Sequence, residues 1–145
     1  MKYKLLSLLA LSFLFVTGAA VAGKGGPIIT GIWAGAGLAM YVDGTSAEIV
    51  SVSAELNQEG NFFHGVAVFE VTVGGVEQPT QIAQMSGHIS GNAINGVMGV
   101  CLEPAPACFG VAHLQGKLSG NKLRGTVVDL SDGSTSMIIL HRMPR

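Results

Sequence analysis

The chain has 145 residues, of which 48% are hydrophobic, only 12% are charged and 21 are glycines. Its formal net charge is −1 at pH 7, and no basic stripe alternates with aromatic residues, which argues against nucleic acid as a partner. The glycines do not precede a helical pattern as phosphate-binding loops require, so we expect no nucleotide or other cofactor.

The first 22 residues have the composition of a secretory signal peptide. Lys2 and Lys4 precede an apolar run that is short for a bilayer span, and Ala20-Val21-Ala22 provides a small-residue cleavage site. We predict cleavage after Ala22, export to the periplasm or the extracellular space, and a single domain at 23–145. The mature chain then has six basic and nine acidic residues, a net charge of −3 with histidine neutral.

The next segments alternate as strands rather than helices. We predict strands from Ile28 to Ala34 and from Leu38 to Val42, followed by a hairpin turn at Asp43-Gly44. A two-residue loop at this turn would place outward-facing residues of the first strand opposite inward-facing residues of the second, although paired residues should face the same side of the sheet. We therefore expect a bulge or a longer turn at this point.

A second hairpin is predicted from Ala47 to Leu56 and from Asn61 to Val73, with its turn at Glu59-Gly60. This turn would place Leu56 opposite Phe63 and Ala54 opposite Gly65. The inward positions would be Val50, Val52, Ala54, Leu56, Phe63, Gly65, Ala67, Phe69, Val71 and Val73.

Two further hairpins turn at Gly-Asn, a strong signal for a two-residue loop. Their strands are expected at 81–90 with 93–102, and at 108–119 with 122–130. Each hairpin, like the second one, has an apolar pair followed by a pair of small residues, which we interpret as an internal repeat. The predicted inward pairs are Ile89 with Ile94, Gly87 with Gly96, Leu118 with Leu123, and Gly116 with Gly125.

A last strand is expected from Ser134 to His141, after a turn at Asp132-Gly133, and no segment shows a helical period. The fold class is therefore all-β: an antiparallel up-and-down meander of eight or nine strands. Closure into a small barrel removes both sheet edges, which the few charges of this chain would protect poorly. A two-sheet β-sandwich is the alternative.

Gly31-Ile32-Trp33 resembles the Gly-x-Trp motif of lipocalin-like and avidin-like barrels, and the five residues from Ile29 to Trp33 are similar to the opening of the avidin type. The resemblance implies an up-and-down barrel. It implies no ligand, because Ala34-Gly35-Ala36-Gly37 stands where avidin-type sites continue with polar and aromatic residues. Trp33 is expected to plug one end of the barrel.

Cys101 and Cys108 are the only cysteines, and in an exported chain we expect them to form a disulfide. Strict alternation places Cys101 on the polar face and Cys108 on the apolar face. A bulge between them, or an irregular loop at the intervening prolines, would reconcile the two positions.

The remaining reactive residue types form no recognisable catalytic or metal site. His64, His88 and His113 fall on the polar face of separate strands, with His64 predicted opposite Glu55, so we expect no metal. Ser, His and Asp are present without a Gly-x-Ser-x-Gly elbow, and we expect no enzyme. Asp129 is an acid at an inward position, and we place it at the rim.

These observations predict an exported, non-enzymatic barrel that binds an apolar small molecule or a protein partner. The alternatives are a small outer-membrane barrel, disfavoured because the aromatic residues form no two girdles, and a self-assembling structural protein. The oligomeric state is left open. The candidate ligand-binding residues are Trp33, Phe63, Phe69, Met85 and Met98.

Overall fold

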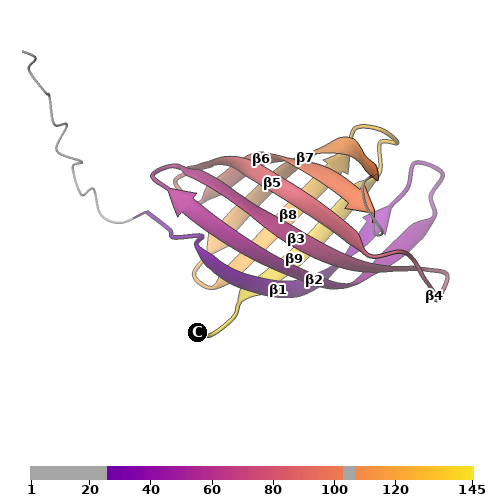
Figure 1. The fold of residues 1–145 in the computed structure, drawn as a ribbon, viewed down its shortest axis with the longest axis horizontal. Coiled ribbons are helices and arrows are strands. Elements are labelled where there is room, and N and C mark those ends of the chain that lie inside the picture. The colour runs from indigo at the N-terminus through magenta and orange to yellow at the C-terminus, as the bar shows by residue number, and fades with distance from the viewer. Residues whose placement is uncertain (1–25, 103–106) are drawn as a thin grey trace, which may run out of the picture.

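The structure is a computed structural model that describes residues 26–102 and 107–145, with side chains outside 100–110. The predicted signal peptide lies outside these residues. Nine antiparallel strands make up the described chain (Figure 1): β1 (Gly31–Met40), β2 (Ser46–Glu59), β3 (Phe62–Val73), β4 (Val76–Glu77), β5 (Gln81–Ser90), β6 (Ala93–Leu102), β7 (Ala107–Ser119), β8 (Lys122–Asp129) and β9 (Thr135–Arg142). Among these residues, no helix is long and apolar enough to cross a membrane.

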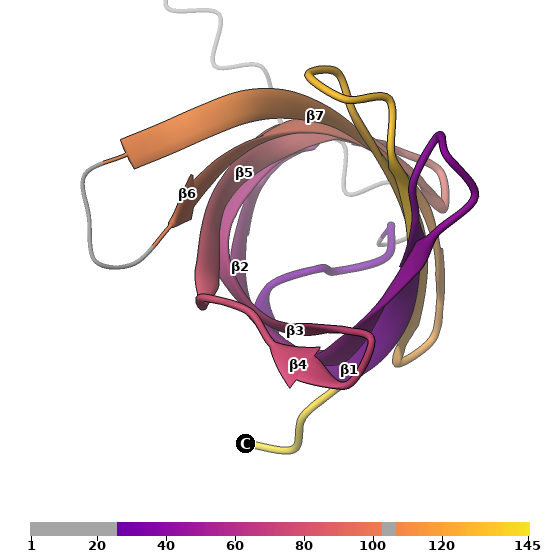
Figure 2. The same cartoon turned by 90° about the vertical axis from the view of Figure 1, so that its right-hand side faces the viewer.

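Eight of the strands close into a barrel, which confirms the predicted fold class and excludes the sandwich. Each strand of the barrel pairs with the next barrel strand along the chain, and β1 pairs with β9 to close the ring. The two-residue β4 lies between β3 and β5 in the chain and pairs only with β3. Figure 2 shows the ring from one end. The two strands expected on either side of Gly35 and Gly37 are one continuous strand, β1.

Alternation divides the side chains between a packed interior and an outer surface. The largest fully buried side chains are Trp33, Ile29, Leu56, Ile94, Met98 and Val52. The outward positions of β7, for example, carry His113, Gln115 and Lys117. Because side chains alternate with a period of two, burial of one set exposes the other.

The two Gly-Asn hairpins have the predicted register. Ile89 lies opposite Ile94 and Gly87 opposite Gly96, and the next hairpin pairs Leu118 with Leu123. Gly91 and Gly120 have φ values of 60° and 59°, and no other residue type in the described chain has a positive φ. A glycine at positive φ followed by an asparagine at negative φ is the pattern of a type II′ turn.

The register predicted for the β2–β3 hairpin is wrong by two residues. Leu56 lies opposite Gly65 instead of Phe63, because the turn is formed by Gly60-Asn61 and not by Glu59-Gly60. Gly60 has a φ of 60°, like the glycines of the other two turns, so the Gly-Asn geometry decides the register. A shift of two residues keeps the inward set inward.

The expected irregularity between β1 and β2 is present as both a longer turn and a bulge. The turn spans Tyr41–Thr45, where the Tyr41 N–H donates to the Thr45 carbonyl at 2.9 Å. The β1–β2 register shifts between Gly35 and Gly37, which lie opposite Val52 and Ile49. The β2–β3 register shifts between Ile49 and Ser51, so Val50 is an extra residue of β2. Val50 was predicted to be buried and is 48% exposed, because the bulge turns its side chain outward.

A second bulge lies between β6 and β7. The register shifts between Gly99 and Val100, and beyond it the backbone of Cys101 lies opposite that of Cys108. A bulge was expected between the two cysteines, and the observed one lies outside the segment that joins them, opposite Phe109 and Val111. Their side chains are outside the described part of the structure, and the predicted disulfide remains a prediction.

Candidate binding cavity at the open end of the barrel

The two ends of the barrel differ, and one end is sealed by Trp33. The Trp33 side chain is completely buried, and its indole N–H donates to the Ile29 carbonyl at 2.7 Å. The Arg142 guanidinium lies 4.5 Å from the centre of the indole ring. It also donates hydrogen bonds to the carbonyls of Ile28 and Thr30. The residues before β1 are therefore held across the closed end.

Gln58 connects this plug to the barrel wall. The Ile29 N–H donates to Gln58 Oε1 at 2.8 Å, and the Gln58 N–H donates to the Thr30 hydroxyl at 2.9 Å. The buried polar atoms of the closed end thus have partners, and Ile29 itself is 1% exposed. A ligand does not enter from this side without breaking the plug.

The middle of the barrel is filled by apolar side chains. The void among them measures about 10 Å³, close to the volume that one water molecule needs. Phe63, Met85 and Met98 all border this void. The Phe63 ring fills the space beside the pair formed by Gly87 and Gly96. A Cβ placed on Gly96 would lie only 3.2 Å from this ring.

A larger cavity of about 150 Å³ opens at the other end. Its deep side is apolar, with Phe69, Met98 and Ala112 among the lining residues, while its rim is polar. The polar lining residues are Tyr41, Gln81, Asp129, Asp132, Ser134 and Ser136. An apolar floor with a few polar groups at the rim is the usual composition of a small-molecule site.

The β8–β9 turn orients the two rim carboxylates. Asp129 Oδ1 accepts hydrogen bonds from the Ser131 N–H at 2.7 Å and the Ser131 hydroxyl at 2.6 Å. Asp132 Oδ1 accepts one from the Ser134 N–H at 2.8 Å. Asp129 is half-buried at the rim, as expected from its inward position at the end of a strand.

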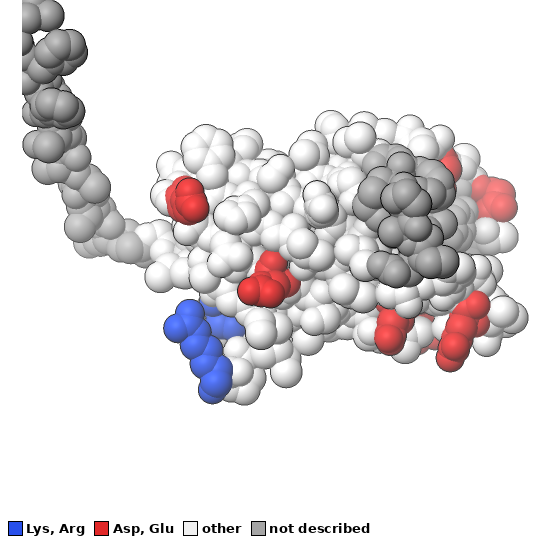
Figure 3. Space-filling model, in the orientation of Figure 1, with Lys and Arg blue, Asp and Glu red and all other residues white. Residues whose placement is uncertain are grey.

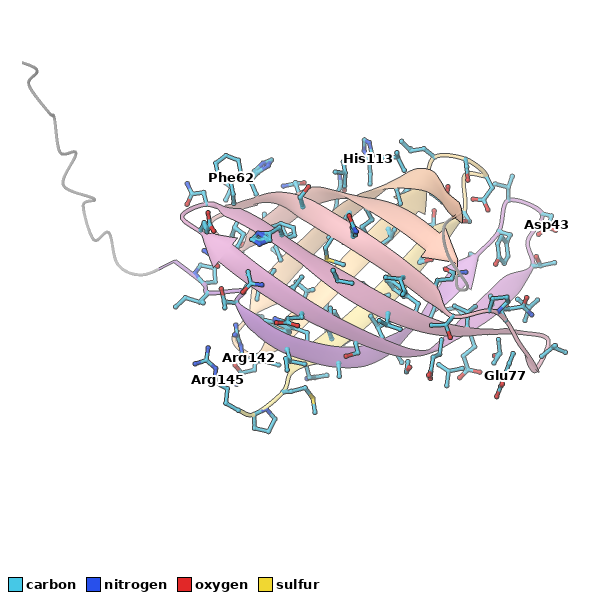
Figure 4. The ribbon with its side chains drawn as sticks, viewed as in Figure 1. Asp43, Phe62, Glu77, His113, Arg142 and Arg145 are labelled. Carbon is cyan, nitrogen blue, oxygen red and sulfur yellow. The ribbon has the colours of Figure 1, made fainter. Side chains whose placement is uncertain are left out.

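The open end is acidic. Figure 4 shows Asp43 and Glu77 at this end, and Arg142 and Arg145 at the closed end. On the face seen in Figure 3, the blue side chains lie only at the closed end, whereas red side chains lie toward both ends, with a group of them at the open end. The pKa of Asp43 is held below its ordinary value of 3.8 by hydrogen bonds from the Thr45 hydroxyl and, secondly, the Thr45 N–H.

The outer surface has a shallow groove of about 620 Å³ across β3, β5 and β6. Phe62, which is 70% exposed, borders it together with His64 and His88. His64 lies opposite Asn57 and not, as predicted, opposite Glu55, a consequence of the shifted β2–β3 register. No three metal-ligating side chains converge within the described residues.

The five candidate ligand-binding residues are thus placed in three environments. Phe69 and Met98 line the open cavity, Phe63 and Met85 pack in the filled middle, and Trp33 belongs to the plug.

The polar rim residues, apart from Asp129, were not predicted from the sequence. Gln81, Ser134 and Ser136 occupy inward positions beside open-end turns, so polar residues at inward positions near strand ends were the available signal. Tyr41 lies in the β1–β2 turn and gave no such signal.

Comparison with known protein families, curated protein sequences and solved structures found no match.

Proposed function

We propose that the protein is an exported, non-enzymatic binding protein that takes a small molecule into the open end of its barrel. The ligand would have an apolar body for the cavity floor and a neutral or positively charged polar head for the rim. The observation that carries this proposal is the cavity of about 150 Å³ between an apolar floor and a polar rim, at the end opposite the plug.

The size of the cavity limits the size of the ligand body. An engineered apolar protein cavity of about 150 Å³ binds benzene, so a single ring or a short branched chain fits. The polar head would then lie among Asp129, Asp132 and Ser136 and reach solvent. An acidic opening attracts cations and repels anions, which favours an amine or a hydroxyl over a carboxylate.

The division of side chains supports a barrel that works in water over the outer-membrane alternative. Membrane barrels turn an apolar band outward and a polar lining inward. Here the lining is apolar, and outward positions on β5, β7 and β8 carry His88, Lys117 and Arg124. Export is supported by the signal-peptide composition of residues 1–22.

Nuclear magnetic resonance with three single-ring aromatic probes tests the proposal. Benzylamine and benzyl alcohol should shift the resonances of Phe69, Met98 and Ala112, with benzylamine binding more tightly than the alcohol, and benzoate should not bind. A dissociation constant on the order of 1 mM, about −4 kcal/mol, is reasonable for a probe of this size. The proposal fails if no probe perturbs the cavity residues.

A filled-cavity variant provides the control. Val127 lines the cavity, and Val128, the next residue of β8, is outward and 37% exposed. Val127→Phe should abolish the probe shifts, and Val128→Phe should leave them unchanged. Binding that survives Val127→Phe in a folded protein would place the ligand elsewhere.

A further inference from the structure

A largely apolar surface covers the outside of β1 and the middle of β9. The other outward residues of β9 are Thr135, opposite Met40, and His141, opposite Ala34. The sequence of β1, GIWAGAGLAM, contains no charged residue. Its outward residues lie beside those of β9, with Ala36 opposite Ile139 and Leu38 opposite Met137. We call this surface the β1–β9 face, and it consists of Ile32, Ala34, Ala36, Leu38, Met40, Met137 and Ile139.

The larger side chains of the β1–β9 face are substantially exposed. Met137 is 53% exposed, Ile32 54% and Leu38 40%. Contiguous apolar surface of this kind is uncommon on a monomer in water and usually marks an interface. Other exposed apolar side chains, such as Val66 and Val97, are separated by polar neighbours such as Gln84 and Ser86.

The two flanks of the β1–β9 face carry opposite charges. On one side, β2 presents Glu48 opposite Leu38 and Glu55 opposite Ile32. On the other side, β8 presents Arg124 opposite Ile139 and Lys122 opposite His141. The face is therefore bounded by acids along one edge and by bases along the other.

From this arrangement we propose that the β1–β9 face binds a second copy of the chain, in a two-fold dimer. Consider a two-fold axis that lies in the plane of the interface and runs parallel to the strands. Rotation about this axis exchanges the two flanks, so the acidic β2 edge of each copy meets the basic β8 edge of its partner. An axis across the strands would instead place acid against acid and base against base. Charge complementarity selects the first arrangement.

The positions along the strands agree with this pairing. Glu48 is level with Leu38, and its proposed partner Arg124 is level with Ala36. Glu55 is level with Ile32, and its proposed partner Lys122 is level with Ala34. Each acid is thus offset from its proposed partner by two residues, about 7 Å, which long side chains span. Strands of the two copies run in the same direction, so both cavities open on the same side of the dimer.

Zero-length carbodiimide cross-linking identifies the contact. Within one copy, Glu55 and Lys122 are separated by three strand spacings, about 14 Å, and do not react with each other. A Glu55–Lys122 cross-link that joins ¹⁴N to ¹⁵N peptides in a mixed sample would support the dimer. A dimer whose cross-links join other surfaces would overturn it.

Sedimentation of matched variants measures the contribution of the face. The wild-type protein should be dimeric at micromolar concentration, and Leu38→Lys should raise its dissociation constant at least tenfold. Val97→Lys, at a site of similar exposure on β6 across the barrel, should leave it unchanged. A wild-type protein that is monomeric at every concentration, or a dimer that tolerates Leu38→Lys, would refute the proposal.

Charge reversal tests the orientation independently of the apolar contact. Glu48→Lys combined with Glu55→Lys should weaken the dimer, and adding Lys122→Glu and Arg124→Glu should restore it. In the fourfold variant each copy has a basic β2 flank and an acidic β8 flank. Dimerisation is restored only if the β2 flank of one copy meets the β8 flank of the other across the interface. Failure of the fourfold variant to dimerise, while it stays folded by circular dichroism, would exclude this orientation.

Discussion

Arg142 reaches from the end of β9 across the plug, and its planar guanidinium makes two kinds of interaction there. Its guanidinium stacks on Trp33 and donates to two carbonyls that precede β1. A guanidinium suits this site because its donors form a fixed fork and its face stacks on an aromatic ring. The pair joins the two ends of the described chain at the closed end of the barrel.

Arg142→Lys should therefore destabilise the protein although the charge is kept. The lysine would lose the forked donors and much of the stacking, at a cost of about 2 kcal/mol. Urea unfolding measures this loss, and Trp33, the only tryptophan, reports it by fluorescence. Arg145→Lys is the matched control at an exposed position and should change nothing. Equal stability of both variants would show that the fork is dispensable.

Asp43 gives the β1–β2 turn a pH dependence of defined sign. Because its pKa is lowered in the folded protein, the ionised carboxylate contributes stability above its unfolded pKa, and this is lost as the pH falls through the folded value. The Thr45 amide should titrate with a midpoint below 3.8 in nuclear magnetic resonance spectra. In Asp43→Asn this titration should vanish. A midpoint above 3.8 would contradict the hydrogen-bond geometry.

At the scale of elements, close approach of strands explains the inward glycines. A Cβ on Gly87 would lie 2.2 Å from the Asn95 carbonyl oxygen on β6, well inside van der Waals contact. Gly65 shows the same close approach, since a Cβ there would lie 2.2 Å from the Glu55 carbonyl oxygen on β2. Glycine at such points permits the strong strand curvature that a small barrel requires. Of the two predicted glycine pairs, Gly87 with Gly96 is such a point, whereas a Cβ on Gly125 would meet only side chains, at 3.2 Å or more.

Gly87→Ala should destabilise the barrel by about 1–3 kcal/mol, because the backbone of β6 has to move. Gly99 offers a matched control on β6, since a Cβ there meets no atom within 4 Å and its φ is not positive. Gly99→Ala should be neutral, or stabilising by up to about 1 kcal/mol through the unfolded state. Thermal or urea unfolding of both variants compares them directly. Similar stabilities would mean that the strands accommodate a methyl group without cost.

At the scale of the whole molecule, closure leaves one end sealed and one end open. Four connections of the meander leave their strands at the open end, and one of them joins β6, which contains Cys101, to β7, which contains Cys108. Backbones directly opposite in an antiparallel pair are within the distance that a disulfide spans. The register is therefore compatible with the disulfide expected of an exported chain.

Reduction of this disulfide should lower the stability by about 2.5 kcal/mol, the chain-entropy value for so short a loop. Urea unfolding with and without reductant measures the difference, and the double variant Cys101→Ser with Cys108→Ser should be insensitive to reductant. If both thiols of the purified, unreduced protein react with iodoacetamide, the disulfide is absent.

The sequence by itself determined the fold class, most strand positions and the side-chain division in the Gly-Asn hairpins, because alternation and turn chemistry are local properties. It did not determine that Val50 points outward, since a bulge is set by the fit between neighbouring strands. Nor did it link Arg142 to Trp33, or collect Gln81, Asp129 and Ser136 around one cavity. Those contacts join residues far apart in the chain, and only closure of the barrel brings them together.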